Sequence, residues 1–148
     1  FHSKTLPCPK DYRICMKFLH TMRQIVHSST APEPFGPYSQ AVRAGDFLFI
    51  SGQIALDPAT GELKMATLGE EVQQVLANLC AVLAAAGAQP SDVVKCSIFL
   101  SDMALFSQVN TYYAQVFGDS SPARETVAVA GLPKGVRVEI SATAYLPL

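Results

Sequence analysis

The sequence has no tryptophan, few charges and no long apolar run, and these shortages exclude several classes of protein. Charged residues make up 16% of its 148 residues, against about 25% in a typical domain. Hydrophobic residues make up 49%, which excludes a disordered chain. The longest apolar run, residues 79–88, is about half the length of a membrane-spanning helix. We expect one soluble domain whose poorly charged surface is partly buried between subunits.

Common cofactor and hydrolase motifs are also missing. The chain contains no glycine-rich phosphate loop with its lysine, and no serine in a nucleophile elbow. Its four cysteines and three histidines have no zinc-like spacing. The sequence therefore predicts reduced thiols in an intracellular protein, and no metal site.

Charge is distributed unevenly along the chain. Residues 1–21 carry a net charge of +3, so residues 22–148 carry −4. Nucleic-acid backbones are bound mainly through Lys and Arg, so we do not expect the domain to bind them. We interpret residues 1–21 as an N-terminal extension, either a presequence or an expression remnant, and residues 22–148 as the domain. We expect a cytoplasmic protein, or one in mitochondria or another organelle if the extension is a presequence.

Hydrophobic periodicity predicts the element order β, β, β, α, β, α, β, β. The predicted strands cover residues 23–28, 40–44, 47–54, 93–100, 126–130 and 136–145, and the predicted helices cover residues 67–87 and 102–118. In the third strand, alternation places Gly52 on one face with Leu48 and Ile50, and Ser51 on the other with Gln53. This order favours an α+β architecture with two helices on one face of a mixed sheet. The other face then requires a partner.

Two charged side chains within apolar strands are the candidate catalytic residues. Arg124 follows Pro122 where a strand begins, and its planar guanidinium could hold a carboxylate through two parallel hydrogen bonds. Glu139 lies within the last strand and could orient or deprotonate a water. Spacing alone favours a plainer interpretation, in which Arg124 pairs with Glu125, and Glu139 with Arg137, as ordinary surface ion pairs.

Four other polar residues also have plain interpretations. Tyr38, in a proline-rich loop, would by default be a packed aromatic residue. Asn110, within a helix, would face solvent or bond to the local backbone. Ser51 and Gln53 would lie on a solvated strand face.

A series of short motifs, in order over nearly all of residues 22–148, favours the functional interpretation. They are residues 36–41 (GPYSQA), 50–54 (ISGQI), Val109, Asn110 and Tyr113, residues 122–124 (PAR), 132–135 (LPKG) and 138–140 (VEI). With these motifs the chain resembles the RidA (YjgF, UK114) family of reactive-intermediate deaminases. The resemblance implies a chorismate-mutase-like fold and a homotrimer. The three sheets would surround a central barrel, with a site in each cleft between subunits.

The resemblance further implies hydrolysis of reactive 2-enamine and 2-imine acids, such as 2-aminoacrylate, to 2-oxo acids and ammonia, the activity of a 2-iminobutanoate/2-iminopropanoate deaminase. Arg124 would hold the substrate carboxylate, and Glu139 would position the attacking water. Tyr38, Ser51, the Gly52 backbone and Asn110 would line the substrate pocket. An imine is already electrophilic, so neither metal nor cofactor is expected.

The chain departs from many bacterial members of the family at two positions. Thr126 stands where they have a cysteine, and Gly131 where some have an arginine. A cysteine-dependent role is therefore not expected. Two other functions remain open: RNA cleavage with inhibition of translation, as in eukaryotic members, and a non-catalytic small-acid-binding or chaperone-like module.

Overall fold

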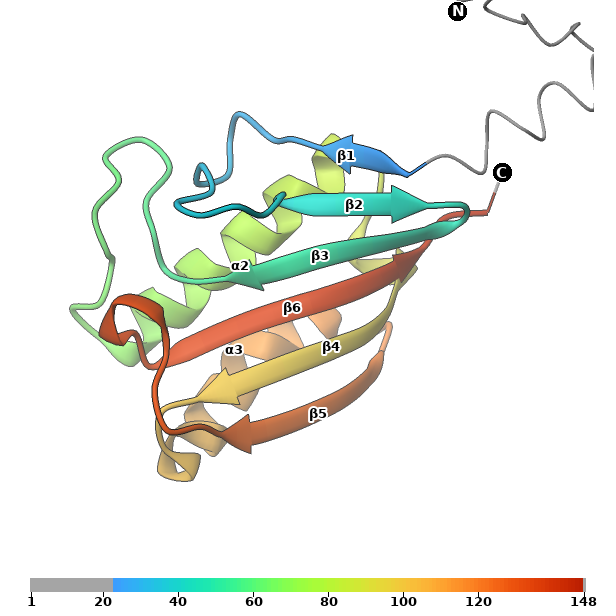
Figure 1. Cartoon of the computed structure of the whole chain (residues 1–148). Coiled ribbons are helices and arrows are strands. Elements are labelled where there is room, and N and C mark those ends of the chain that lie inside the picture. The colour runs from blue at the N-terminus through green and yellow to red at the C-terminus, as the bar shows by residue number, and fades with distance from the viewer. Residues whose placement is uncertain (1–22, 148) are drawn as a thin grey trace, which may run out of the picture.

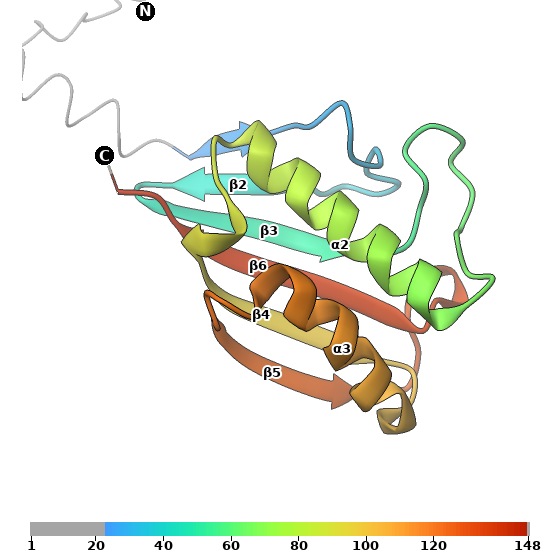
Figure 2. The same ribbon diagram turned by 180° about the vertical axis from the view of Figure 1, so that it is seen from behind.

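The computed structural model describes residues 23–147, which form a six-stranded sheet covered on one face by two helices (Figures 1 and 2). The strand order is β1-β2-β3-β6-β4-β5; β4 and β5 run parallel, and the other neighbouring pairs run antiparallel. The predicted α+β class and element order are confirmed. The extension at residues 1–21 lies outside the described residues. The strands are β1 (Gln24–Val26), β2 (Ala41–Ala44), β3 (Phe47–Gln53), β4 (Val93–Leu100), β5 (Ala123–Ala128) and β6 (Val138–Tyr145), and the helices are α2 (Leu68–Ala85) and α3 (Phe106–Phe117).

The long helix α2 has the start and the buried face that its sequence predicts. The Thr67 hydroxyl accepts a hydrogen bond from the Glu70 amide at 3.1 Å and so caps the helix. Gly87, at φ +73°, follows its end in the left-handed conformation that favours glycine. Between them an apolar stripe is buried against the sheet; it includes Val72, Val75, Leu79, Val82 and Leu83.

Two strands begin elsewhere than the sequence predicts. Strand β5 starts at Ala123 and not near residue 126, because its parallel ladder with β4 begins directly after Pro122. Strand β6 starts at Val138 and not at residue 136, because a short 3-10 turn, Pro133–Gly135, precedes it. Arg124 therefore lies inside a strand.

Strand β3 contains a bulge that the alternating pattern did not predict. Ile50 pairs with Ala142 of β6 and Gln53 with Ile140, so three steps on β3 match two on β6. The extra residue changes the phase of the strand. Gln53 is therefore buried, and Gly52 lies against Glu139 beside Ser51. The predicted faces of Gly52 and Gln53 were wrong.

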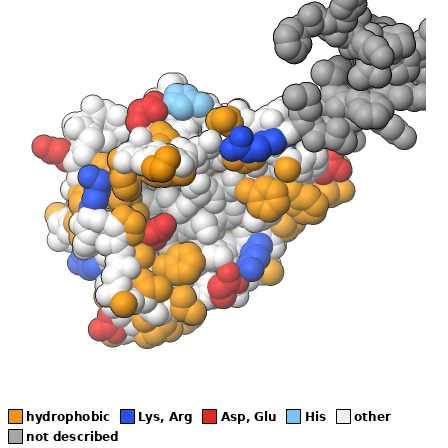
Figure 3. All heavy atoms as spheres, viewed as in Figure 1, with side chains coloured by type: hydrophobic (Ala, Val, Ile, Leu, Met, Phe, Trp, Pro, Cys, Tyr) orange, Lys and Arg blue, Asp and Glu red, His pale blue; other side chains and the backbone are white. Residues whose placement is uncertain are grey.

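The face of the sheet opposite the helices remains open in this chain. Phe47, Phe49 and Tyr145 are exposed on it, and their rings pack together at centroid distances of 5.3 Å and 6.4 Å. Figure 3 shows this face, which is hollowed, with hydrophobic side chains gathered around the hollow. Within residues 23–147 no element covers this face. The sequence predicted such a face, left by two helices on one side of the sheet. Neither described helix has the length and apolarity needed to cross a membrane.

Candidate functional site

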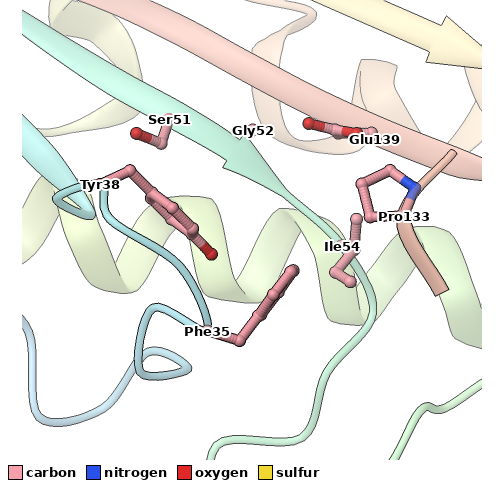
Figure 4. A pocket seen from close by; sticks show the side chains of 7 residues that line it. All are labelled: Phe35, Tyr38, Ser51, Gly52, Ile54, Pro133 and Glu139. Atoms are coloured by element: carbon pink, nitrogen blue, oxygen red, sulfur yellow. The ribbon is translucent and has the colours of Figure 1, made fainter.

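A cavity of about 270 Å³ lies where the bulge of β3 meets the start of β6. One wall is apolar and consists of aromatic and aliphatic side chains; the other carries the polar groups of Ser51, Gly52 and Glu139 (Figure 4). The apolar wall is made by Phe35, Tyr38, Ile54 and Pro133. The fold thus brings together Tyr38, Ser51, Gly52 and Glu139, which are four of the six predicted site residues.

Glu139 is the one carboxyl group among the residues that line this cavity. Its carboxyl group is half-buried, and that burial raises its pKa above the ordinary glutamate value. No charged neighbour from the described residues offsets the effect. A β-carbon placed on Gly52 would lie 2.7 Å from the Glu139 carboxyl carbon, so the absent side chain at position 52 leaves room for the carboxyl group. A raised pKa makes the carboxylate a stronger proton acceptor, as a general base requires.

Hydrogen bonds join Ser51 of β3 to the loop before β2 and so fix the part of the cavity that Ser51 and Tyr38 line. The Ser51 hydroxyl donates to the Ser39 carbonyl at 2.7 Å, and the Ser51 amide donates to the Gln40 carbonyl at 3.0 Å. The buried Gln40 side chain in turn donates to the Pro32 carbonyl at 2.8 Å. Tyr38 is exposed to 42% and meets Phe35 edge to face at 5.9 Å. It is therefore a cavity residue and not the packed loop aromatic of the plainer interpretation.

Arg124 and Asn110 line a second cavity of about 330 Å³, between α3 and the edge strand β5. The guanidinium donates to the Asn110 side-chain oxygen at 2.7 Å. It also lies 4.8 Å from the Tyr113 ring centroid and 5.7 Å from that of Phe106. Asn110 thus orients Arg124, where the plainer interpretation had it facing solvent or bonding to the backbone.

The two surface ion pairs of the plainer interpretation do not form. Glu125 bonds to Lys95 at 3.3 Å and to the Ser97 hydroxyl, and these contacts lower its pKa, with the Ser97 hydrogen bond the largest cause. Arg137 pairs with Glu71 of α2 at 2.6 Å. Among the described residues no carboxylate pairs with Arg124 and no cation pairs with Glu139. Both candidate catalytic side chains therefore remain available to a ligand.

Arg124 and Glu139 lie in different cavities of this chain. Arg124 is opposite the buried Cys96 in the ladder and contacts α3 on the helical side of the sheet. Glu139 alternates with the buried Val138 and Ile140, so its side chain lies on the open side. One chain therefore presents two separate cavities, which we call the Glu139 cavity and the Arg124 cavity.

Sequence reasoning left several cavity residues unassigned, and four of them bear on the two sites: Phe35, Ile54, Pro133 and Tyr113. Three of them lie within the quoted motifs, and Phe35 directly precedes one. The sequence pattern placed Ile54 in a strand, Pro133 in a turn and Tyr113 on the apolar side of a helix, and none of these assignments pointed to a cavity. The signal for Phe35 was its position three residues before Tyr38.

The described residues offer no obvious metal or thiol chemistry. Across residues 23–147 no three side chains of His, Cys, Asp or Glu gather as metal ligands would. Burial raises the pKa of the thiols of Cys80 and Cys96 and so disfavours the nucleophilic thiolate. The charged groups that the two cavities present are the Glu139 carboxyl group and the Arg124 guanidinium.

Comparison with known proteins assigns the fold and the family. The family model described as endoribonuclease L-PSP matches residues 28–146, which include the Glu139 and Arg124 cavities. The chain belongs to this family, which includes YjgF and RidA. The predicted family resemblance is confirmed.

Members of the endoribonuclease L-PSP family with different names resemble this chain. A RutC family protein of Pyrococcus horikoshii is 48% identical over 124 residues, covering 84% of this chain and 98% of the relative. A 2-iminobutanoate/2-iminopropanoate deaminase of Bos taurus is 46% identical over 123 residues, covering 83% and 90%. The crystal structure of E. coli TdcF with bound serine has a TM-score of 0.78 and 38% identity, covering 82% of this chain and 98% of that one.

Proposed function

We propose that this family member hydrolyses 2-imino acids, and the enamines in equilibrium with them, to 2-oxo acids and ammonia. The half-buried Glu139 carboxyl group, with its raised pKa, is the observation that carries the proposal. It lies in a cavity large enough for a small acid, without a described ion-pair partner. Two relatives add support: the bovine one is named for this activity, and E. coli TdcF binds serine, a small amino acid with a carboxylate.

The complete site would form between copies of the chain in a homotrimer. A single chain keeps Arg124 and Glu139 in separate cavities, so a second chain must bring an Arg124 cavity to the Glu139 cavity of the first. The exposed rings of Phe47, Phe49 and Tyr145 give the open sheet face an apolar surface that suits burial against other copies. Three such sheets around one axis form the homotrimeric barrel expected from the sequence.

In this site Arg124 binds the substrate and orients it. The guanidinium is held by the Asn110 oxygen and lies against the aromatic rings of α3, so little side-chain freedom is lost when it binds a carboxylate. Its remaining N–H groups can hold the two oxygens of the carboxylate in one plane. Tyr38, Ser51 and the Gly52 backbone line the cavity beside the imine carbon and fix its approach to Glu139.

Glu139 acts on the attacking water. The water oxygen bonds to the imine carbon, the π-electron pair of the C=N bond moves to nitrogen, and Glu139 takes a proton from the water. Glu139 gives this proton to the nitrogen, which completes the tetrahedral carbinolamine with its hydroxyl and NH2 groups. In the second stage Glu139 carries the hydroxyl proton to the nitrogen, the O–H electron pair forms the C=O bond of the 2-oxo acid, the C–N bond breaks and ammonia leaves, so the enzyme ends in its starting state.

The test couples the protein to a serine or threonine dehydratase in the presence of semicarbazide, which traps the released imine. We expect faster formation of 2-oxo acid and less trapped adduct with the parent chain. Arg124→Ala and Glu139→Gln are expected to lose this effect. No acceleration by the parent chain, or an Arg124→Ala variant as active as the parent, contradicts the proposal.

RNA cleavage is the second candidate, because the matching family model is described as an endoribonuclease. The domain's net charge of −4 gives it little electrostatic attraction for a phosphate backbone. RNA binding that weakens with salt, together with RNA cleavage lost in Arg124→Ala, would favour this candidate.

A non-catalytic small-acid-binding or chaperone-like module is the third candidate. It requires that Arg124→Ala abolish carboxylate binding and that Glu139→Ala leave every function intact.

A further inference from the structure

Glu71, on the buried face of α2, is a carboxylate with no exposed surface. A charged group removed from water is costly unless it is paired and hydrogen-bonded. The position of its partners therefore shows which part of the fold this carboxylate organises. No role in the proposed chemistry has so far been given to it.

The main partners of Glu71 lie at the start of β6. One carboxylate oxygen accepts hydrogen bonds from the backbone amides of Arg137, at 2.6 Å, and Val138, at 3.3 Å. The other accepts from the Arg137 side-chain Nε at 2.6 Å. The same guanidinium donates to the Met65 carbonyl at 3.0 Å. Glu71 thus fixes two consecutive backbone amides, and the next residue along the chain is Glu139.

The start of β6 needs such an anchor because the sheet holds it on one side only. The ladder between β3 and β6 ends at the pair of Gln53 and Ile140, so Glu139 is paired across β4 alone, opposite Phe99. The preceding turn is irregular, with Lys134 at φ +55° and Gly135 at φ +69°. Apart from β4, whose neighbour Ser101 donates to the Arg137 carbonyl at 2.9 Å, Glu71 is the group that binds the backbone amides of residues 137 and 138.

We propose that Glu71 is a positioning residue, whose buried carboxylate holds the start of β6 so that the Glu139 side chain stays in its cavity against Gly52. The inference rests on the proposed function, since it assigns a task to Glu139. It adds a residue 68 positions away in sequence and on the opposite side of the sheet.

The charged groups on the elements around Glu139 are otherwise engaged. Lys95 pairs with Glu125 on the neighbouring strands, and Lys134 lies 5.1 Å from the Phe35 ring centroid. Arg137 is held by Glu71. Loss of Glu71 therefore acts on Glu139 through the position of the strand and through release of the Arg137 side chain.

The experiment compares Glu71→Gln and Glu71→Ala with Val82→Ala in the coupled imine assay, at a temperature where all three variants are folded. Val82 is fully buried on the same helix, about 16 Å further along its axis, so it reports general destabilisation. We expect Glu71→Ala to lower kcat at least tenfold. Glu71→Gln, which keeps an oxygen for the two amides, should recover part of that loss. Val82→Ala should retain the parent kcat.

The pH profile separates positioning from simple destabilisation. Burial raises the pKa of Glu139, so the acid limb of kcat/KM should move to lower pH in Glu71→Ala, where the carboxyl group is freed toward water. NMR titration of the Glu139 carboxyl carbon gives the same readout without any activity. If Glu71→Ala fails to fold, the titration and profile of Glu71→Gln decide.

An unchanged kcat and an unchanged Glu139 titration in the folded Glu71 variants would overturn the inference. So would a loss of kcat in Val82→Ala equal to that in Glu71→Ala. An inactive parent chain is a different result, because it contradicts the proposed function. In that case the NMR titration still tests whether Glu71 keeps the Glu139 side chain buried.

Discussion

Gly52 and Glu139 lie against each other across β3 and β6, and the Glu139 side chain fills the space that a side chain at position 52 would take. A β-carbon there would stand 2.7 Å from the carboxyl carbon of Glu139 and 2.9 Å from its Cγ, both too close for real contacts. The neighbour that would have to move is a flexible side chain and not backbone. A larger residue at position 52 would therefore displace the Glu139 side chain and leave the backbone fold in place.

Gly52→Ala should accordingly fold but lose activity. The added methyl group displaces the Glu139 carboxyl group from its cavity, and removing a positioned general base typically costs about 10²- to 10⁴-fold in rate. Coupled imine assays and thermal melts measure the two effects. Gly131→Ala is the matched control, because a β-carbon at position 131 meets nothing within 4 Å. Full activity in Gly52→Ala would show that Glu139 need not occupy this position.

Glu139→Gln should be inactive and, at neutral pH, more stable than the parent. The folded pKa of Glu139 is raised by burial, so its contribution to stability is present below the unfolded pKa of about 4.3 and is lost as pH rises through the folded value. The stabilising effect of the amide should therefore be seen at pH 7 and vanish near pH 3. Thermal melts at one protein concentration measure it.

Glu125→Gln provides a control of opposite sign for this pH dependence. Hydrogen bonds from Ser97 and Lys95 lower the pKa of Glu125, so its contribution is present above the unfolded pKa and lost as pH falls through the folded value. The amide variant should be slightly less stable than the parent at pH 7. A shift of the same sign in both variants would contradict the assigned environments.

Asn110→Asp should weaken substrate binding without unfolding the protein. The new carboxylate would pair with Arg124 at the present 2.7 Å contact and compete with the substrate carboxylate for the guanidinium. We expect KM to rise about tenfold, which corresponds to about 1.4 kcal/mol. Thr111→Asp, which adds the same charge at the next, exposed position of α3, should leave KM near that of the parent. Equal KM values in both variants would contradict the role of Arg124 in substrate binding.

Two inactive variants should restore activity when mixed. If each site takes Arg124 from one chain and Glu139 from its neighbour, refolding equal amounts of Arg124→Ala and Glu139→Gln together returns about a quarter of the sites to the parent composition. Coupled assays of the mixture measure the recovery. Mixing Arg124→Ala with the double variant is the control, since no chain then supplies Arg124. Mixed trimers without any recovery would show that the two residues do not share a site.

The sequence predicted the parts of the fold that depend on local pattern. The β-branched run at residues 93–100 gave both ends of β4, and the Thr67 cap gave the start of α2. Strand β5 was predicted three residues too late, because Pro122 was taken as a longer break than the parallel ladder with β4 allows. The bulge in β3 could not be seen from alternation, since it depends on how β6 pairs with β3.

The ion pairs show why the site was only partly predictable. Arg137 stands two residues from Glu139 in sequence, yet it turns toward Glu71, 66 residues away. Only the packing of α2 on the sheet makes that partner available. The grouping of Tyr38, Ser51, Gly52 and Glu139 was expected from the family motifs, while the separation of Arg124 into a second cavity required coordinates.

Strand β6 separates the residues of the core from those on the open side, where Glu139 lines its cavity. Its even-numbered positions from Val138 to Ala144 are buried beneath the helices, while the odd-numbered ones, beginning with Glu139, lie on the open side. Mutations can therefore rewrite one set of positions while the other keeps the domain intact. Such a strand lets descendants of one scaffold acquire new reactions by small steps, without first having to evolve a new core.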